Sequence, residues 1–110
     1  MVYIEKINEE IIIKIGQNQK ENDELIKEGK QNDLWFHLKE NSSPHGFIQN
    51  NTNKELSKEV IYRTAQLVKE FSKFRAYSKV KIIYIELKHI KCTDIPGTVI
   101  IKKKTKEIIV

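Results

Sequence analysis

Short, largely apolar segments separated by polar residues in the first part of the chain predict two short strands. They are residues 2–7 and 10–15, and the second segment is rich in β-branched isoleucine. Gly16 and the polar residues 17–19 then predict a turn. Residues 20–28 have helical spacing, with Asn22, Leu25 and Ile26 on one inward edge and Gly29 as a C-terminal stop.

The middle of the chain contains a strictly alternating segment at residues 34–38. Leu34, Phe36 and Leu38 lie on one face of such a strand, while Trp35 and His37 lie on the other. A connection through Pro44 leads to a short strand at about 46–48, and residues 49–54 form a polar loop. If the two strands pair, His45 and Phe47 share the face of Trp35.

The second half predicts one long helix followed by further strands. The helix runs from about 57 to 74, with Ser57 as its N-cap and an apolar stripe that we assign to the core. Residues 79–87 form a strand, and 98–102 and 107–110 form a closing hairpin joined through 103–106. The predicted fold is therefore one α+β domain over residues 1–110. It has a mostly antiparallel sheet, one long amphipathic helix and one short N-terminal helix.

Composition narrows the class of protein. No apolar run approaches the roughly 18 residues of a membrane span, and the N-terminus has no signal-peptide pattern. Cys92 is the only cysteine, which excludes a disulfide framework and a thiolate zinc site. We therefore expect a cytoplasmic protein without a membrane partner, metal or cofactor.

Charge is distributed unevenly along the chain. Residues 1–29 contain four lysines and seven acids, whereas residues 71–106 contain ten basic residues and two acids. Such a gradient favours a polyanionic partner on one side of the molecule. The lysines at 102–104 are individually typical of a solvated turn, but with the other basic residues of this region they form a positive field.

The polar face of the 34–38 strand permits two kinds of chemistry. Asp33, His37 and His45 contain the groups of an acid–base site, although no nucleophile motif or metal-ligand spacing accompanies them. Binding fits the residue types better. An exposed Trp35 would offer a stacking surface for a base, and His, Lys, Ser and Asn side chains contact phosphates, sugars and base edges.

Several motifs resemble the NFACT-R domain, formerly called DUF814. They are Gly16, the segment 20–25, Asn32-Asp33-Leu34-Trp35-Phe36-His37, Ser43-Pro44-His45, Lys91 and the segment 95–100. The resemblance covers about residues 10–110, and the Asp-Leu-Trp-Phe-His string with its downstream histidine is highly specific. Details around residues 21–26 and 42–45 are most similar to the standalone branch represented by coiled-coil-domain-containing protein 25.

This resemblance implies an RNA-binding domain of translation or ribosome-associated quality control, with tRNA or rRNA as partner and the large ribosomal subunit as a site of action. We expect no enzymatic activity. On the family match and the residue types together, the predicted nucleic-acid-binding residues are Lys20, Asn22, Asp33, Trp35, His37, Ser43, His45, Lys88 and Lys91.

Three alternatives stay open at the level of sequence. One is a DNA-binding module, as in one branch of the family. Another is an RNA-processing or RNA-modifying enzyme that uses Asp33, His37 and His45. The last is a protein-docking adaptor on the ribosome, for which RNA binding would be weak and insensitive to salt.

Overall fold

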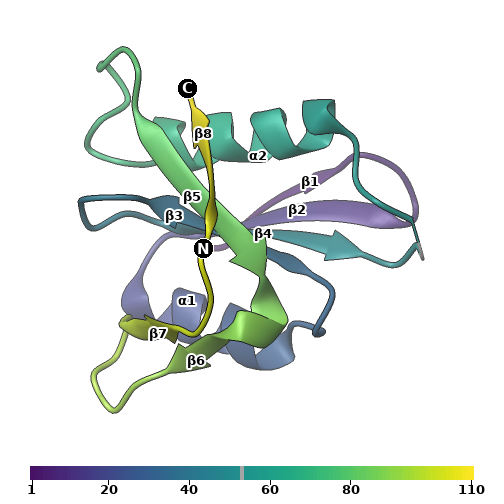
Figure 1. The fold of residues 1–110 in the computed structure, drawn as a ribbon, viewed down its shortest axis with the longest axis horizontal. Coiled ribbons are helices and arrows are strands. Elements are labelled where there is room, and N and C mark those ends of the chain that lie inside the picture. Colours follow the sequence, from purple (N-terminus) through teal and green to yellow (C-terminus); the bar gives the residue numbers. More distant parts are fainter. Residues whose placement is uncertain (53) are drawn as a thin grey trace.

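A computed structural model describes residues 1–52 and 54–110, and its main element is a six-stranded antiparallel sheet covered on both faces (Figure 1). Neighbouring strands follow the order β1-β2-β4-β3-β5-β8. The strands are β1 (Tyr3–Lys6), β2 (Ile11–Gly16), β3 (Leu34–Leu38), β4 (His45–Asn50), β5 (Lys81–Glu86) and β8 (Lys106–Ile109). The predicted α+β class with two α-helices is confirmed for the described residues.

One face of the sheet packs under helix α2 (Lys58–Glu70). Phe36 and Leu38 of β3 point toward this helix because alternate residues of a strand share a face, and Val68 of α2 packs in the same cluster. This cluster contains ten buried residues, four of them from α2, so most of the apolar stripe of the helix belongs to the core as predicted, whereas Phe71 at its end is 38% exposed. The whole cluster is Ile13, Ile15, Phe36, Leu38, Ile48, Val60, Ala65, Leu67, Val68 and Ile82.

The other face of the sheet holds a second core, which the sequence did not predict. Helix α1 (Gln19–Glu28) and a two-stranded ribbon of β6 (Ile90–Cys92) and β7 (Val99–Ile101) cover it (Figure 1). A 3₁₀ turn, η1 (Leu87–His89), leads into this ribbon. The buried residues of this core are Leu25, Trp35, Phe47, Ile83, Ile85, Leu87 and Ile90.

Helix ends follow the expected capping chemistry. The Asn18 side chain accepts a hydrogen bond from the N–H of Glu21, and Ser57 caps α2 by accepting from Val60. Helix α2 ends at Glu70, four residues earlier than the sequence predicts. The Ser72 N–H and hydroxyl both donate to the Lys69 carbonyl, so a tighter turn replaces the α-helical pattern there.

The predicted closing hairpin is wrong. Strand β7 pairs with β6, whereas β8 pairs with β5 in the large sheet, so the two C-terminal strands belong to different sheets. Their apolar pattern predicts strands but carries no information about partners. Strand β4 also begins earlier and ends later than predicted and takes in part of the polar segment 49–54, of which Asn53 lies outside the described residues. None of the described helices is long and apolar enough to cross a membrane.

Candidate nucleic-acid interface

The register of β3 and β4 brings the predicted site residues of the two strands together. Trp35 faces Phe47 and Phe36 faces Gly46, so His37 and His45 lie next to each other at the same end of the strands. Their ring centroids are 5.0 Å apart and the rings meet edge to face at 81°. We call these two residues the histidine pair.

Trp35 lies inside the second core and orients the histidine pair. Its indole is 1% exposed, stacks on the His37 ring at 5.6 Å, and donates from Nε1 to Nδ1 of His45 at 3.2 Å. The prediction that this indole offers a stacking surface for bases is therefore wrong, because α1 and the β6–β7 ribbon cover its side of the sheet. Its role here is to hold an imidazole in place.

Helix α1 supplies the second contact to His45. The Asn22 side chain is buried, and its Oδ1 accepts a hydrogen bond from the backbone N–H of His45 at 3.3 Å. Gly16 pairs with His45 across β2 and β4, and a Cβ on Gly16 would lie 2.2 Å from the same Asn22 oxygen. Only glycine permits this close approach, so Gly16, Asn22 and His45 form one packed unit.

Ser43 fixes the loop between β3 and β4. Its hydroxyl accepts from the Leu38 N–H at 3.0 Å and donates to the Pro44 carbonyl at 2.9 Å.

The loop before β7 contacts helix α1, since the Gly97 N–H donates to the Asp23 carboxylate. Gly97 has φ +79°, a backbone conformation that favours glycine. These contacts bring sequence motifs that are distant along the chain close together in the fold.

Both histidines are held neutral. Burial lowers the pKa of His45 to about 3, and the neighbouring His37 ring contributes to this shift. Burial also lowers the pKa of His37, and its hydrogen bond to the Leu38 carbonyl opposes that effect in part. A neutral imidazole provides no charge attraction to a phosphate, so the histidines act as hydrogen-bonding groups rather than as cations.

Asp33 lies at the opposite end of β3, about 13 Å from the histidine pair at roughly 3.3 Å per residue. Its Oδ2 accepts from the Lys30 N–H at 3.0 Å, and its Oδ1 accepts from the Asn50 N–H at 3.1 Å. The side chain is 4% exposed. The hypothesis of an acid–base group made of Asp33, His37 and His45 is therefore wrong, and the Asp33 carboxylate is occupied in a structural turn rather than free to bind nucleic acid.

The predicted lysines are exposed and lie on three different elements. Lys20 is in the first turn of α1 and Lys91 is in β6. Lys88 is in η1, where its Nζ is 3.5 Å from the carboxylate of Glu86. Each is exposed and can contact a phosphate from its own position.

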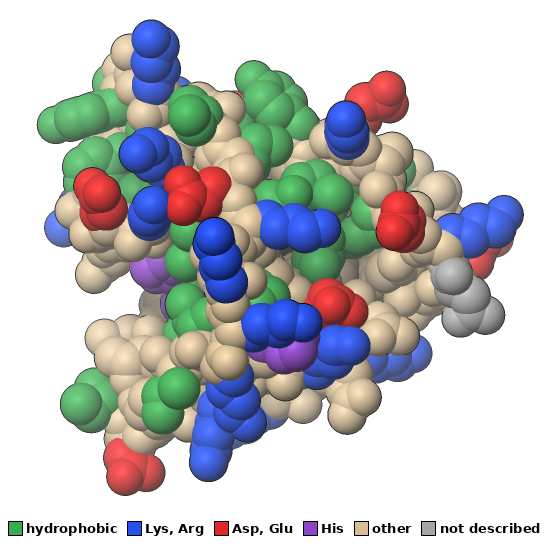
Figure 2. All heavy atoms as spheres, viewed as in Figure 1, with side chains coloured by type: hydrophobic (Ala, Val, Ile, Leu, Met, Phe, Trp, Pro, Cys, Tyr) green, Lys and Arg blue, Asp and Glu red, His purple; other side chains and the backbone are tan. Residues whose placement is uncertain are grey.

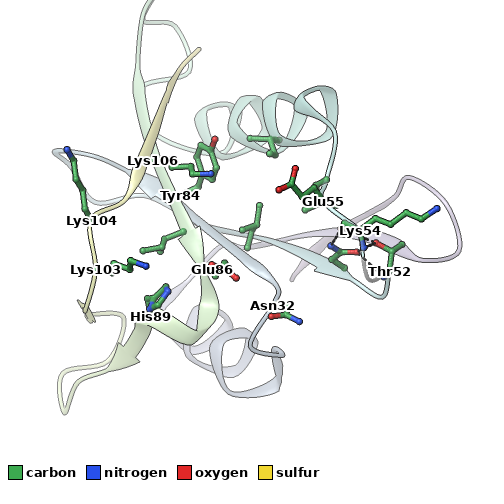
Figure 3. A pocket seen from close by; sticks show the side chains of 15 residues that line it. Asn32, Thr52, Lys54, Glu55, Tyr84, Glu86, His89, Lys103, Lys104 and Lys106 are labelled. Atoms are coloured by element: carbon green, nitrogen blue, oxygen red, sulfur yellow. Dashed lines mark hydrogen bonds between the residues drawn. The ribbon is translucent and has the colours of Figure 1, made fainter.

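A second surface, which the sequence did not predict as a site, is a groove of about 590 Å³ on the α2 side of β3 and β5. Lys103, Lys104 and Lys106 lie along one wall, and Lys54 lies on the other (Figure 3). We call it the lysine groove. Tyr84 and Leu34 are in its apolar floor, and its remaining lining residues are Asn32, Asn50, Thr52, Glu55, Leu56, Ile61, Ile85, Glu86 and His89.

The lysine groove carries a net positive charge. It has four lysines against Glu55 and Glu86, and within the described residues none of these four lysines forms a salt bridge. Figure 2 shows Lys and Arg side chains gathered over β8 and the segment before it, on the same face of the molecule. In the sequence, the run of basic residues at 102–106 was the only sign of this groove. That the run lies beside an apolar floor depends on strand pairing, which the sequence does not show.

The domain has neutral histidines, an aspartate engaged in internal hydrogen bonds, and a basic groove. These features fit a class of protein that binds polyanions. Comparison with known sequences assigns the family: residues 1–103 match the NFACT protein RNA binding domain, so the chain belongs to this family. It is accordingly an RNA-binding domain rather than an enzyme.

Known relatives are longer than this chain. The Rqc2 homolog RqcH of Streptococcus suis is 40% identical over 78 residues, which are 70% of this chain and 14% of that protein. Coiled-coil domain-containing protein 25 of Danio rerio is 33% identical over 85 residues, which are 74% of this chain and 41% of the relative. The chain thus spans less than half of these relatives.

A solved structure has the same fold. The C-terminal part of the fibronectin/fibrinogen-binding protein from Streptococcus suis superposes with a TM-score of 0.83 at 32% sequence identity. The match covers 97% of this chain and 43% of that structure. The fold described here is thus that of its family.

Proposed function

We propose that this domain binds structured RNA, a tRNA or a ribosomal RNA, and that the lysine groove contacts the phosphate backbone. Family membership supports RNA as the ligand. Similarity to RqcH supports a place in ribosome-associated quality control, with the large ribosomal subunit as the location. The observation that carries the proposal is the groove itself, because four lysines line it and none of them forms a salt bridge among the described residues.

The chemistry of the groove suits a nucleic acid strand. Lys103 and Lys106 point toward the groove in Figure 3 and can pair with phosphates, while asparagine side chains at 32 and 50 offer amide groups to sugars and base edges. The phosphate contacts would supply affinity and salt dependence.

Filter binding of tRNA and of a ribosomal RNA fragment at several salt concentrations tests the proposal. In the double variant Lys103→Gln/Lys104→Gln, two phosphate contacts are removed. The slope of log affinity against log salt should then become less steep by about 1.5, at roughly 0.7–0.9 per contact. The matched control Lys6→Gln/Lys73→Gln removes the same charge from exposed positions outside the groove and should leave most of the slope.

Equal slopes for the two double variants would contradict the groove as the interface. Competition with single-stranded and duplex DNA of the same sequence distinguishes an RNA-binding module from a DNA-binding one. An adaptor that docks on protein would show weak RNA binding with little dependence on salt.

A further inference from the structure

Hydrogen bonding fixes the proton positions of His45. The indole N–H of Trp35 is only a donor, so Nδ1 of His45, 3.2 Å away, must offer its lone pair. A neutral imidazole has one N–H, which is then on Nε2. His45 therefore presents a donor at Nε2.

His37 has the opposite arrangement. Its Nδ1 lies 2.6 Å from the Leu38 carbonyl oxygen, which is only an acceptor, so Nδ1 carries the proton. Nε2 of the neutral ring then has a lone pair. The histidine pair thus combines one Nε2–H donor and one Nε2 acceptor on rings whose centroids are 5.0 Å apart.

The Nε2 atoms of the histidine pair have no protein partner within residues 1–52 and 54–110. The same part of the chain contains no fully buried side-chain nitrogen or oxygen that lacks a partner, so both atoms reach solvent. His45 is only 1% exposed, so the surface that its Nε2 offers to a ligand is very small. A buried polar group of this kind gains most when a specific partner satisfies it.

We propose that the histidine pair binds a ribose 2′-hydroxyl and so makes the domain prefer RNA to DNA. This inference rests on the proposed function and adds the group that is recognised. A hydroxyl oxygen accepts from the Nε2–H of His45 while its proton is donated to Nε2 of His37. An unprotonated phosphate oxygen only accepts, so it leaves the His37 lone pair without a donor. Deoxyribose has no hydroxyl at this position.

The histidine pair is placed so that one RNA strand can contact both this pair and the lysine groove. His37 is in register with Ile83 of β5 and, beyond it, with Glu107 of β8. The adjacent register row ends at Lys106, which lines the groove on the other face of the sheet. An RNA strand that passes the β8 edge can therefore reach both surfaces. Lys39, whose Nζ is 2.7 Å from Glu107, lies at the same edge.

Affinities for three oligonucleotides of one sequence test the inference: RNA, DNA and 2′-O-methyl RNA. The wild-type protein should bind RNA about tenfold more tightly than DNA, as two added hydrogen bonds predict. His37→Phe keeps a ring against Trp35 but removes the acceptor, and His45→Asn keeps an acceptor for the indole but removes the Nε2–H. Each variant should bring the RNA-to-DNA ratio close to one with little change in DNA affinity.

The matched control is Lys103→Gln/Lys104→Gln, which should weaken binding to RNA and DNA alike and preserve their ratio. Circular dichroism first establishes that each histidine variant is folded, and either folded variant suffices for the test. An unchanged RNA-to-DNA ratio in a folded variant would overturn the inference and leave a water molecule as the occupant. Failure of the wild-type protein to bind any RNA would refute the proposed function, and this inference with it.

Discussion

Stability of this domain should fall as the pH falls from 7 to 5, because His45 must stay neutral in the folded state. Its folded pKa of about 3 lies below the ordinary value of 6.5, so the unfolded chain binds the proton more readily. The contribution of His45 is therefore fully present above pH 6.5 and is lost progressively as the pH falls toward 3. The lowered pKa of His37 acts in the same direction.

The size of the effect follows from the two pKa values. A difference of one pKa unit corresponds to about 1.4 kcal/mol, so at pH 5 the unfolded state gains about 2 kcal/mol from protonation of His45. Below pH 3 the full difference is about 5 kcal/mol. Since a domain of this length has a total stability of about 5–15 kcal/mol, the loss at pH 5 is a large fraction of it.

Urea unfolding at pH 7 and pH 5, followed by tryptophan fluorescence, measures this loss. Trp35 is the only tryptophan and is buried against His45, so its emission reports on the relevant part of the fold. The comparison variant is His45→Asn, whose amide oxygen can still accept from the indole but which does not titrate. It should lose about 2 kcal/mol less than the wild type between the two pH values.

Carboxylates whose pKa is lowered in the folded state, such as Glu5 beside Arg63, act mainly below pH 5 and cancel in this comparison. Equal losses in wild type and His45→Asn would refute the argument that His45 is held neutral by burial. A proton NMR titration of the wild-type protein checks the same point directly, since the His45 ring signal should stay constant from pH 7 to pH 5.

Three further predictions concern stability. Gly46→Ala should cost about 1–3 kcal/mol, because the added Cβ would lie 2.5 Å from a methyl group of Val68. Asn18→Ala removes the α1 cap and should cost about 1 kcal/mol. Arg63→Met breaks the ion pair with Glu5, but because Arg63 is 40% exposed the cost should stay below about 1 kcal/mol and shrink further in high salt. Urea unfolding measures all three.

Each of these outcomes has a clear opposite. A neutral Gly46→Ala would mean that the contact between β4 and α2 relaxes easily. A neutral Asn18→Ala would assign the start of α1 to packing alone, and a loss above 2 kcal/mol in Arg63→Met would show that the exposed pair matters more than solvent screening allows.

Local patterns in the sequence determined most of the elements. Alternation in residues 34–38 specified a strand with Phe36 on the core face, and the Ser57 cap with its apolar stripe specified the start of α2. Both features depend on residues close together in the chain, where spacing alone decides which side chains share a face. The resemblance to NFACT-R, now confirmed by the match over residues 1–103, also came from such strings.

Strand partners and the surroundings of the polar residues depended on tertiary structure. A β7 or β8 sequence favours an extended strand equally well beside any partner, so the sequence could not reveal that they join different sheets. The Trp35 face looked too polar for a core, yet α1 and the β6–β7 ribbon bury it. That burial holds the histidines neutral, and the hydrogen bonds of His45 with Trp35 and of His37 with the Leu38 carbonyl fix their proton positions, because desolvation and direction are properties of three-dimensional packing.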